Sequence, residues 1–269
     1  MVRMLKGLRH LAGREDPSAS QDPWSSVDLA HTFESGITVR VKSLSDWWVF
    51  NEVFVDRDYD PAIDLLLERI EAGTAPLILD LGANVGFFCA RVIDRLSGSG
   101  VAGHLVIVEG SPAVYRDLES RLEHMHSDLV TVTPVNGLIG AREGFGTISE
   151  VDFGARNTVH PEHNSGIKPI SEMAHHKVPF VDLTGVIGPQ QRISLLKCDI
   201  EGSEESFLEN YAADLLSRAD VAVFELHRTL CDVSRCLAIL EEAGLRVVTS
   251  IAQADDTSLT LLVREDSPS

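Results

Sequence analysis

Short apolar runs that alternate with helical segments constrain the fold of this chain most strongly. The runs LILDL (77–81), HLVIVEG (104–110) and RISLLKCDI (192–200) are nearly continuous in apolar residues, which is typical of strands that are buried on both faces. Apolar residues at helical spacing follow the first run, over residues 84–96. The alternation predicts a doubly wound, mostly parallel α/β sheet, in which ligands bind at the carboxyl ends of the strands.

The other segments divide the 269-residue chain around this core. Residues 1–27 predict a flexible N-terminal segment, because their second half is rich in Ser, Pro and Asp. Residues 28–75 predict an extension in which FESGITVRV and DWWVFNEVF pair as a β-hairpin and DPAIDLLLERIEAG forms a helix. The core domain is expected over residues 76–264. Its polar segment 141–176 is interpreted as an excursion that serves as a substrate lid.

Composition excludes some partners and favours a compartment. The chain has 41 acidic and 23 basic residues, for a net charge of −18, so we predict no nucleic-acid partner and no anionic membrane partner. No apolar stretch approaches the roughly 20 residues that cross a bilayer. The four cysteines form no C-x-x-C pair, and we expect buried free thiols in a reducing cytoplasm. The sequence is compatible with a homodimer but does not establish one.

The first predicted core strand runs into a glycine-rich loop and then a helix, which is the context of a nucleotide site. The loop has the spacing G-x-x-x-G and a leading acid, instead of the G-x-G-x-x-G of dinucleotide folds. An acid beside a pyrophosphate is unfavourable, whereas the zwitterionic methionine end of S-adenosylmethionine suits both the acid and the backbone N–H groups. The predicted cofactor-binding residues of this loop are Asp80, Gly82, Ala83, Asn84 and Gly86.

The next two predicted strands also end in residues that suit a nucleoside. Glu109, followed by Gly110, can accept hydrogen bonds from both ribose hydroxyls. Asn136 ends the third strand, where an amide can contact the adenine ring; a turn-forming role is equally compatible with asparagine there. We therefore include Glu109, Gly110 and Asn136 among the predicted cofactor contacts.

Titratable residues gather at the ends of the fourth and fifth predicted strands. Asp199 and Glu201 follow one strand, and Glu225 and His227 end the other on a common face. We predict Asp199, Glu201 and His227 as catalytic residues, with His227 as the general base and Asp199 as the alternative base and a further cofactor contact. A Mg²⁺ ion bridging Asp199 and Glu225 is a further prediction. A structural ion network that includes Lys197 is the alternative.

Three segments resemble the FkbM family of S-adenosylmethionine-dependent methyltransferases: LDLGANVGFF, VIVEGSP and LLKCDIEGSEESFL. The upstream segment WVFNEVFVDRDY is also similar, and the resemblance covers roughly residues 45–264. It implies a Rossmann-like, seven-stranded class I methyltransferase sheet, and cofactor contacts at Asp80, Gly82, Asn84 and Glu109. The chain departs from the family pattern over 141–176 and at Gly137-Leu138.

The family mostly methylates hydroxyl oxygens, so the resemblance implies O-methylation of a small-molecule natural product, sugar or glycan. Two other functions stay open from the residues alone. One is a partner protein that binds S-adenosylmethionine without catalysis, which the acids at both strand ends disfavour. The other is a nucleotide-dependent oxidoreductase on a similar fold, which the absence of G-x-G-x-x-G disfavours.

Overall fold

The structure of the protein is a computed structural model, and it describes most of the chain. The described residues are 24, 26–150, 157–160, 162, 170–188, 191–253 and 257–265. Nearly all of the predicted N-terminal segment 1–27 and part of the excursion 141–176 lie outside these ranges.

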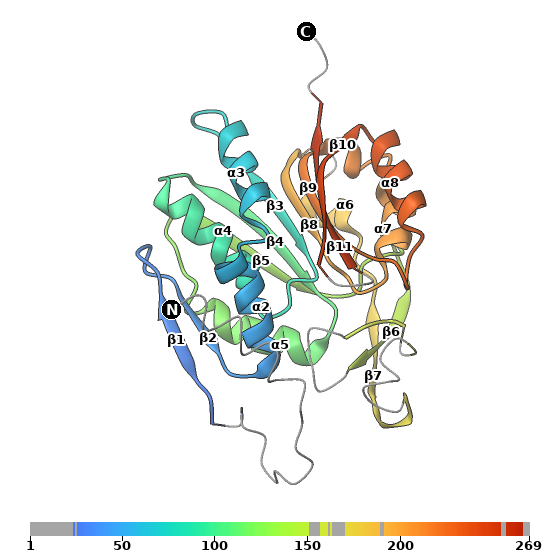
Figure 1. Ribbon diagram of the computed structural model, residues 1–269, viewed down its shortest axis with the longest axis horizontal. Coiled ribbons are helices and arrows are strands. Elements are labelled where there is room, and N and C mark those ends of the chain that lie inside the picture. Colours follow the sequence, from blue (N-terminus) through green and yellow to red (C-terminus); the bar gives the residue numbers. More distant parts are fainter. Residues whose placement is uncertain are drawn as a thin grey trace.

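A seven-stranded sheet in the order β10-β11-β9-β8-β3-β4-β5 forms the centre of the protein (Figure 1). Neighbouring strands from β9 to β5 are parallel, and β11 runs antiparallel to both β9 and β10. This confirms the predicted Rossmann-like fold, including the antiparallel closing pair. The strands are β3 (Leu77–Leu81), β4 (Gly103–Glu109), β5 (Val130–Asn136), β8 (Ile193–Cys198), β9 (Ala219–His227), β10 (Leu245–Ala252) and β11 (Thr257–Arg264).

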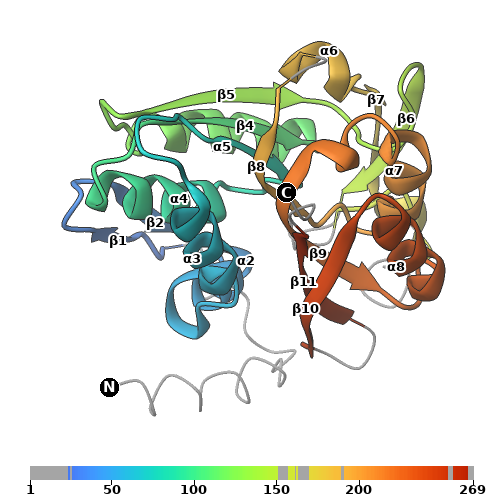
Figure 2. The same cartoon turned by 90° about the horizontal axis from the view of Figure 1, so that it is seen from above.

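Helices cover both faces of the sheet and enclose one apolar core on each side (Figure 2). One face packs against α3 (Asp60–Arg69), α4 (Phe87–Gly98) and α5 (Pro112–Leu122). The other face packs against α6 (Leu183–Ile187), α7 (Glu204–Tyr211), the short η6 (Leu216–Arg218) and α8 (Val233–Glu242). Strand β3 lies between the two cores with all five residues buried, which explains why four of them are apolar.

The N-terminal extension corrects the predicted hairpin. The observed hairpin pairs β1 (Leu29–Thr32) with β2 (Thr38–Val41), and the segment DWWVFNEVF is helical. That segment forms α2 (Leu44–Phe50), which continues into the π-helical η2 (Asn51–Asp56). Ser43 caps α2 by accepting a hydrogen bond from the N–H of Asp46, and aromatic packing against α4 then outweighs the strand preference of the aromatic residues.

The polar excursion contains regular structure that the sequence reading missed. Strands β6 (Phe145–Glu150) and β7 (Ala174–Pro179) pair antiparallel in a separate ribbon beside the main sheet (Figure 1), and a 3₁₀ turn, η5 (Ile170–Glu172), precedes β7. Leu138, Ile148 and Val178 form a small apolar cluster under this ribbon. The ribbon is therefore packed against the loop that follows β5.

All four cysteines are buried free thiols, as predicted. They are Cys89, Cys198, Cys231 and Cys236. In the part of the chain that the structure describes, no helix has the length and apolar character needed to cross a membrane.

Gly82 is required by the packing of the loop after β3. Its φ is +79°, and a Cβ atom built there would lie 1.7 Å from the backbone oxygen of Asp199. We expect Gly82→Ala to lower the free energy of unfolding by about 2–4 kcal/mol, because left-handed strain and overpacking add together. Gly36→Ala is the matched control, since Gly36 also has a positive φ but faces open space. Urea denaturation that gave equal losses for the two variants would contradict this prediction.

Candidate functional site

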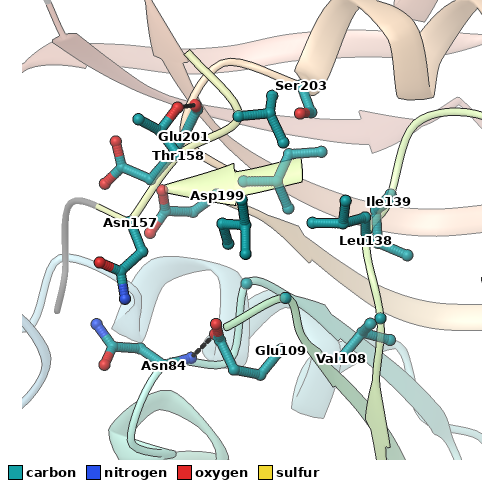
Figure 3. Close-up of a pocket in the computed structure, with 16 residues that line it drawn as sticks. Asn84, Val108, Glu109, Leu138, Ile139, Asn157, Thr158, Asp199, Glu201 and Ser203 are labelled. Atoms are coloured by element: carbon teal, nitrogen blue, oxygen red, sulfur yellow. Dashed lines mark hydrogen bonds between the residues drawn. The ribbon is translucent and has the colours of Figure 1, made fainter. Parts of the chain in front are cut away.

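A pocket lies at the carboxyl ends of β3, β4, β5 and β8, where the fold class predicts a ligand (Figure 3). Its empty volume is about 600 Å³, which includes open solvent. The glycines and the polar side chains in the lining belong to Gly82, Asn84, Glu109, Gly110, Gly137, Asn157, Thr158, Asp199, Glu201 and Ser203. The apolar lining consists of Val108, Leu138, Ile139, Ile148, Val159 and Ile200.

Glu109 joins two of the loops that line the pocket. Its carboxylate accepts hydrogen bonds from the backbone N–H of Asn84 (2.9 Å) and of Ser111 (2.7 Å). Burial raises the pKa of Glu109 to about 7, although these two hydrogen bonds and the charge of Lys197 lower it. Glu109, which the sequence predicts to bind the nucleoside, therefore also connects two loops of the protein, and its carboxyl group titrates near neutral pH.

Lys197 lies at the centre of an ion network between β3 and β8. Its Nζ donates to the backbone oxygen of Gly82 (2.7 Å) and lies 3.4 Å from Asp80 and 3.6 Å from Asp199. Burial lowers the pKa of Lys197, but the charges of Asp80, Asp199 and Glu225 outweigh it and raise that pKa above its ordinary value. Burial raises the pKa of Asp80 despite the nearby ammonium group. The lysine thus pairs with both acids.

Asp80 is fully buried and lies behind the pocket lining. Its two carboxylate oxygens have no hydrogen-bond partner among the described residues. It therefore contributes negative charge beneath the glycine-rich loop. Ala83 and Gly86, two other predicted contacts, are also outside the lining; their N–H groups bond to the backbone oxygens of Val108 and Ala83.

Three potential ligand side chains come together at the ends of β8 and β9. Asp199, Glu201 and His227 each place one ligand atom within 4.8 Å of the others. Nε2 of His227 lies 3.5 Å from Glu201, and Nδ1 lies 3.7 Å from Glu204. The predicted catalytic residues are thus adjacent, and Glu204, in the first turn of α7, is a further neighbour that the sequence did not single out.

The surroundings of His227 determine its protonation. Burial lowers the pKa of His227, but the carboxylates of Glu204, Glu201 and Asp199 outweigh burial and raise it to about 10. In the protein without ligands the imidazole is therefore protonated at neutral pH and has no free lone pair for a proton. This favours Asp199, the alternative base, because its carboxylate lines the pocket.

Glu225, one of the two predicted Mg²⁺ ligands, lies outside the group of side chains that surrounds Asp199. Among the described residues, the close group of possible ligands contains Asp199 without Glu225. Glu225 lies 3.9 Å from Nε2 of His227, and burial followed by the charge of Asp199 raises its pKa well above the ordinary value. The arrangement brings Glu201 and His227 to Asp199 in its place.

Asn136 is committed to the backbone of the protein. Its Nδ2 donates to the backbone oxygen of Glu109 at 2.8 Å and reaches that of Gly110 at 3.4 Å. It is absent from the pocket lining, so the turn-stabilising alternative accounts for it. Gly110 does line the pocket, and a Cβ atom there would press on Leu138 at 3.0 Å.

The excursion supplies a wall of the pocket that no sequence motif identified. Ile148 on β6 and the residues Asn157, Thr158 and Val159 are part of the lining, as Figure 3 shows for Asn157 and Thr158. The hydroxyl of Thr158 donates to the backbone oxygen of Glu201 at 2.6 Å. The wall is therefore attached to the acidic loop after β8. The pairing of β6 with β7 could have been inferred only from the weak alternation of apolar and polar residues around Ile148.

The sequence profile of the Methyltransferase FkbM domain matches residues 80–247, which include the cofactor loop and both acidic strand ends. The chain belongs to this family, and it is an S-adenosylmethionine-dependent methyltransferase. The site fits that cofactor, because carboxyl groups outnumber cations around the pocket and S-adenosylmethionine carries a sulfonium and an ammonium group. The match favours the methyltransferase over the oxidoreductase.

Several solved methyltransferase structures are similar to this chain at low sequence identity. The METTL16 methyltransferase domain is 13% identical, with a TM-score of 0.49, over 91% of this chain and 90% of that one. Precorrin-6y C5,15-methyltransferase from Geobacter metallireducens is 12% identical, with a TM-score of 0.44, over 78% and 88%. Aeropyrum pernix fibrillarin with bound S-adenosylmethionine is 16% identical, with a TM-score of 0.41, over 91% and 85%. No curated protein sequence matches the chain significantly.

Proposed function

We propose that the protein transfers the methyl group of S-adenosylmethionine to a hydroxyl oxygen of a small molecule, sugar or glycan. The observation that carries this proposal is the position of Asp199, whose carboxylate lines the same pocket as Gly82, Asn84 and Glu109. A proton acceptor and the proposed cofactor contacts are thus parts of one cavity. When bound, the cofactor supplies a methyl carbon attached to a positively charged sulfur.

Each part of the pocket has a separate task in this proposal. Glu109 accepts hydrogen bonds from the ribose hydroxyls with the lone pairs that its two backbone contacts leave free. The carboxylates of Asp80 and Asp199 attract the positive charges of the cofactor. Alignment of the acceptor oxygen with the methyl carbon provides most of the rate enhancement.

The transfer itself is an in-line displacement. The acceptor oxygen forms a bond to the methyl carbon while the carbon–sulfur bond breaks, and the electron pair of that bond goes to sulfur. The hydroxyl proton moves to the carboxylate of Asp199. S-adenosylhomocysteine and a methyl ether are the products, so atoms and charge balance.

The charge of the pocket supports neutral, hydroxylated acceptors. Asp199 and Glu201 line it, whereas the cations beside them, Lys197 and the protonated His227, are buried. A phosphate or carboxylate beside the reacting hydroxyl would meet an excess of negative charge. This supports sugars, polyols and phenols over nucleic acids.

The atom that receives the methyl group can be read directly. The full-length protein is incubated with carbon-13 methyl-labelled S-adenosylmethionine and a panel of sugars, polyols, phenols and amines. We expect labelled products with the carbon chemical shift of a methyl ether, which differs from that of an N-methyl or C-methyl group. Labelling confined to amines or to carbon would overturn the proposed O-methylation and leave the methyltransferase class intact.

Cofactor affinity is expected to depend on pH through Glu109. The ionised carboxylate accepts the ribose hydroxyls, and its pKa is about 7 in the free protein. Affinity should therefore be constant above that pH and fall by up to about tenfold per pH unit below it. Calorimetric titration with S-adenosylmethionine and S-adenosylhomocysteine between about pH 5.5 and 7.5 measures this.

Glu109→Gln is the control for the pH dependence, because it keeps the size of the side chain and removes the titrating group. Its affinity should be low and nearly independent of pH. Equal slopes in the variant and the wild type would show that another group titrates.

A further inference from the structure

We propose that Asp199, Glu201 and His227 form a binding site for one divalent transition metal ion, such as Mn²⁺, Fe²⁺ or Zn²⁺. One ligand atom from each residue lies within 4.8 Å of the others. Nε2 of His227 and Oε2 of Glu201 are 3.5 Å apart. Two ligand atoms that each lie about 2.1 Å from a tetrahedral ion are separated by roughly 3.4 Å, so this pair already has a suitable spacing.

The side chain of His227 is buried, and its two ring nitrogens face different carboxylates. Its side chain is 7% exposed, and Nδ1 has no hydrogen-bond partner among the described residues. Nδ1 faces Oε1 of Glu204 at 3.7 Å, while Nε2 faces Oε2 of Glu201 at 3.5 Å. Metal-binding histidines commonly have this arrangement, in which a carboxylate orients one ring nitrogen and the ion binds the other.

Glu204 is held firmly enough to orient the ring. It is fully buried, and its two carboxylate oxygens accept hydrogen bonds from the N–H of Ile200 (3.1 Å) and of Gly202 (3.0 Å). The loop that carries Asp199 and Glu201 is therefore tied to the carboxylate that faces His227. A capping role alone would require neither the proximity of Glu204 to the imidazole nor its complete burial.

The ion network around Lys197 leaves one ligand oxygen available. Lys197 contacts Oδ2 of Asp199 at 3.6 Å, whereas the buried Oδ1 has no hydrogen-bond partner among the residues that the structure describes. The salt bridge to Lys197 gives Oδ2 a partner but provides none for Oδ1. An ion at Oδ1 would satisfy this oxygen.

The ligand types select the metal. Mg²⁺, which sequence predicted with Asp199 and Glu225, prefers oxygen ligands and retains water, whereas an imidazole favours a transition metal. An ion here would lie at the wall of the pocket, where a Lewis acid lowers the pKa of a hydroxyl. That role rests on the proposed O-methylation, but binding of the ion does not.

The test measures binding of Mn²⁺ to the full-length protein after treatment with a chelator and its removal. The signal of free Mn²⁺ in electron paramagnetic resonance falls as the ion binds, and we expect one bound ion per chain. Glu201→Gln, His227→Gln and Asp199→Asn should each weaken binding by about 10–100-fold. Mg²⁺ should compete for the site at least about tenfold less well than Zn²⁺.

His176→Ala is the matched control, because His176 also lies near a carboxylate, 3.1 Å from Glu150, but belongs to the β6–β7 ribbon. It should bind Mn²⁺ like the wild type. Circular dichroism establishes folding of each variant, and Glu201→Gln keeps the test informative if His227→Gln does not fold, since Glu201 is one-fifth exposed. Absence of bound Mn²⁺ in the wild type, or unchanged binding in Glu201→Gln, would overturn the proposed site. Either result leaves the O-methylation assay unaffected.

Discussion

Asp199→Asn is expected to lower the turnover of methyl transfer by about 10²–10⁴-fold, the usual contribution of a positioned general base. The carboxylate of Asp199 lines the pocket, and an amide of the same shape cannot accept the hydroxyl proton. We expect the affinity for S-adenosylmethionine to change by less than about tenfold, because the Glu109 contacts are untouched. Initial rates of S-adenosylhomocysteine formation and calorimetric titration measure the two effects separately.

Two further variants show whether the loss of turnover is caused by removal of the general base. Asp220→Asn removes an acid that pairs with Arg192 far from the pocket lining, and its rate should stay within about twofold of the wild type. Glu201→Gln removes a proposed metal ligand and leaves Asp199 in place. If Asp199→Asn retained more than about a tenth of the wild-type turnover, Asp199 would not be the base.

Lys197→Met is expected to lower the free energy of unfolding by about 3–5 kcal/mol, which is typical when one partner of a buried ion pair is removed. Asp80 is fully buried, and Lys197 is the cation 3.4 Å from its carboxylate. Without it, the acid must be buried with its charge or take up a proton. The variant also loses the hydrogen bond to the backbone oxygen of Gly82. Urea denaturation followed by circular dichroism measures the loss.

A double variant separates the charge from the packing. Lys197→Met combined with Asp80→Asn removes the fully buried charge at Asp80 and leaves only that of Asp199, which is one-quarter exposed, so it should be more stable than Lys197→Met alone. Lys177→Met, at an exposed lysine that lies over the ring of Phe145, is the surface control and should change stability by about 0.5 kcal/mol or less. A Lys197→Met loss no larger than that of Lys177→Met would refute the proposed importance of the network.

The sheet was predictable because its strands are buried on both faces. Burial makes β3, β4 and β8 mostly apolar, and such runs are hard to mistake when helices separate them. The ends of these strands were therefore correct to within a few residues. Those ends placed Gly82, Glu109 and Asp199 at one edge of the sheet, where all three line the pocket.

The segment DWWVFNEVF shows where local composition misled. Its aromatic residues favour a strand, yet Trp47, Phe50 and Phe54 are spaced as i, i+3 and i+7 and lie on one side of a helix that packs on Phe87. The cap at Ser43 was a second available signal. Helical period and capping should have been weighed above strand preference.

The chemistry of His227 could not be inferred from its own position. Strand alternation placed it beside Glu225, but its protonation follows from Glu201 and Glu204, which come from the preceding loop and helix. The sequence predicted the excursion as a substrate lid, but the contact that attaches it to the acidic loop was equally inaccessible. Thr158 reaches Glu201 across 43 positions of sequence, and no local pattern records that contact.

The close approach of Gly82 to the backbone oxygen of Asp199 also bears on how catalysis is prepared. The N–H of Asp199 donates to the backbone oxygen of Leu81 at 3.0 Å, so a hydrogen bond joins the loop after β3 to the loop after β8 beside this contact. The spacing between the proposed cofactor loop and the proposed proton acceptor is therefore set when the chain folds. Ligand binding therefore does not need to bring the cofactor loop and the proton acceptor together, which makes the site preorganised for the transfer step.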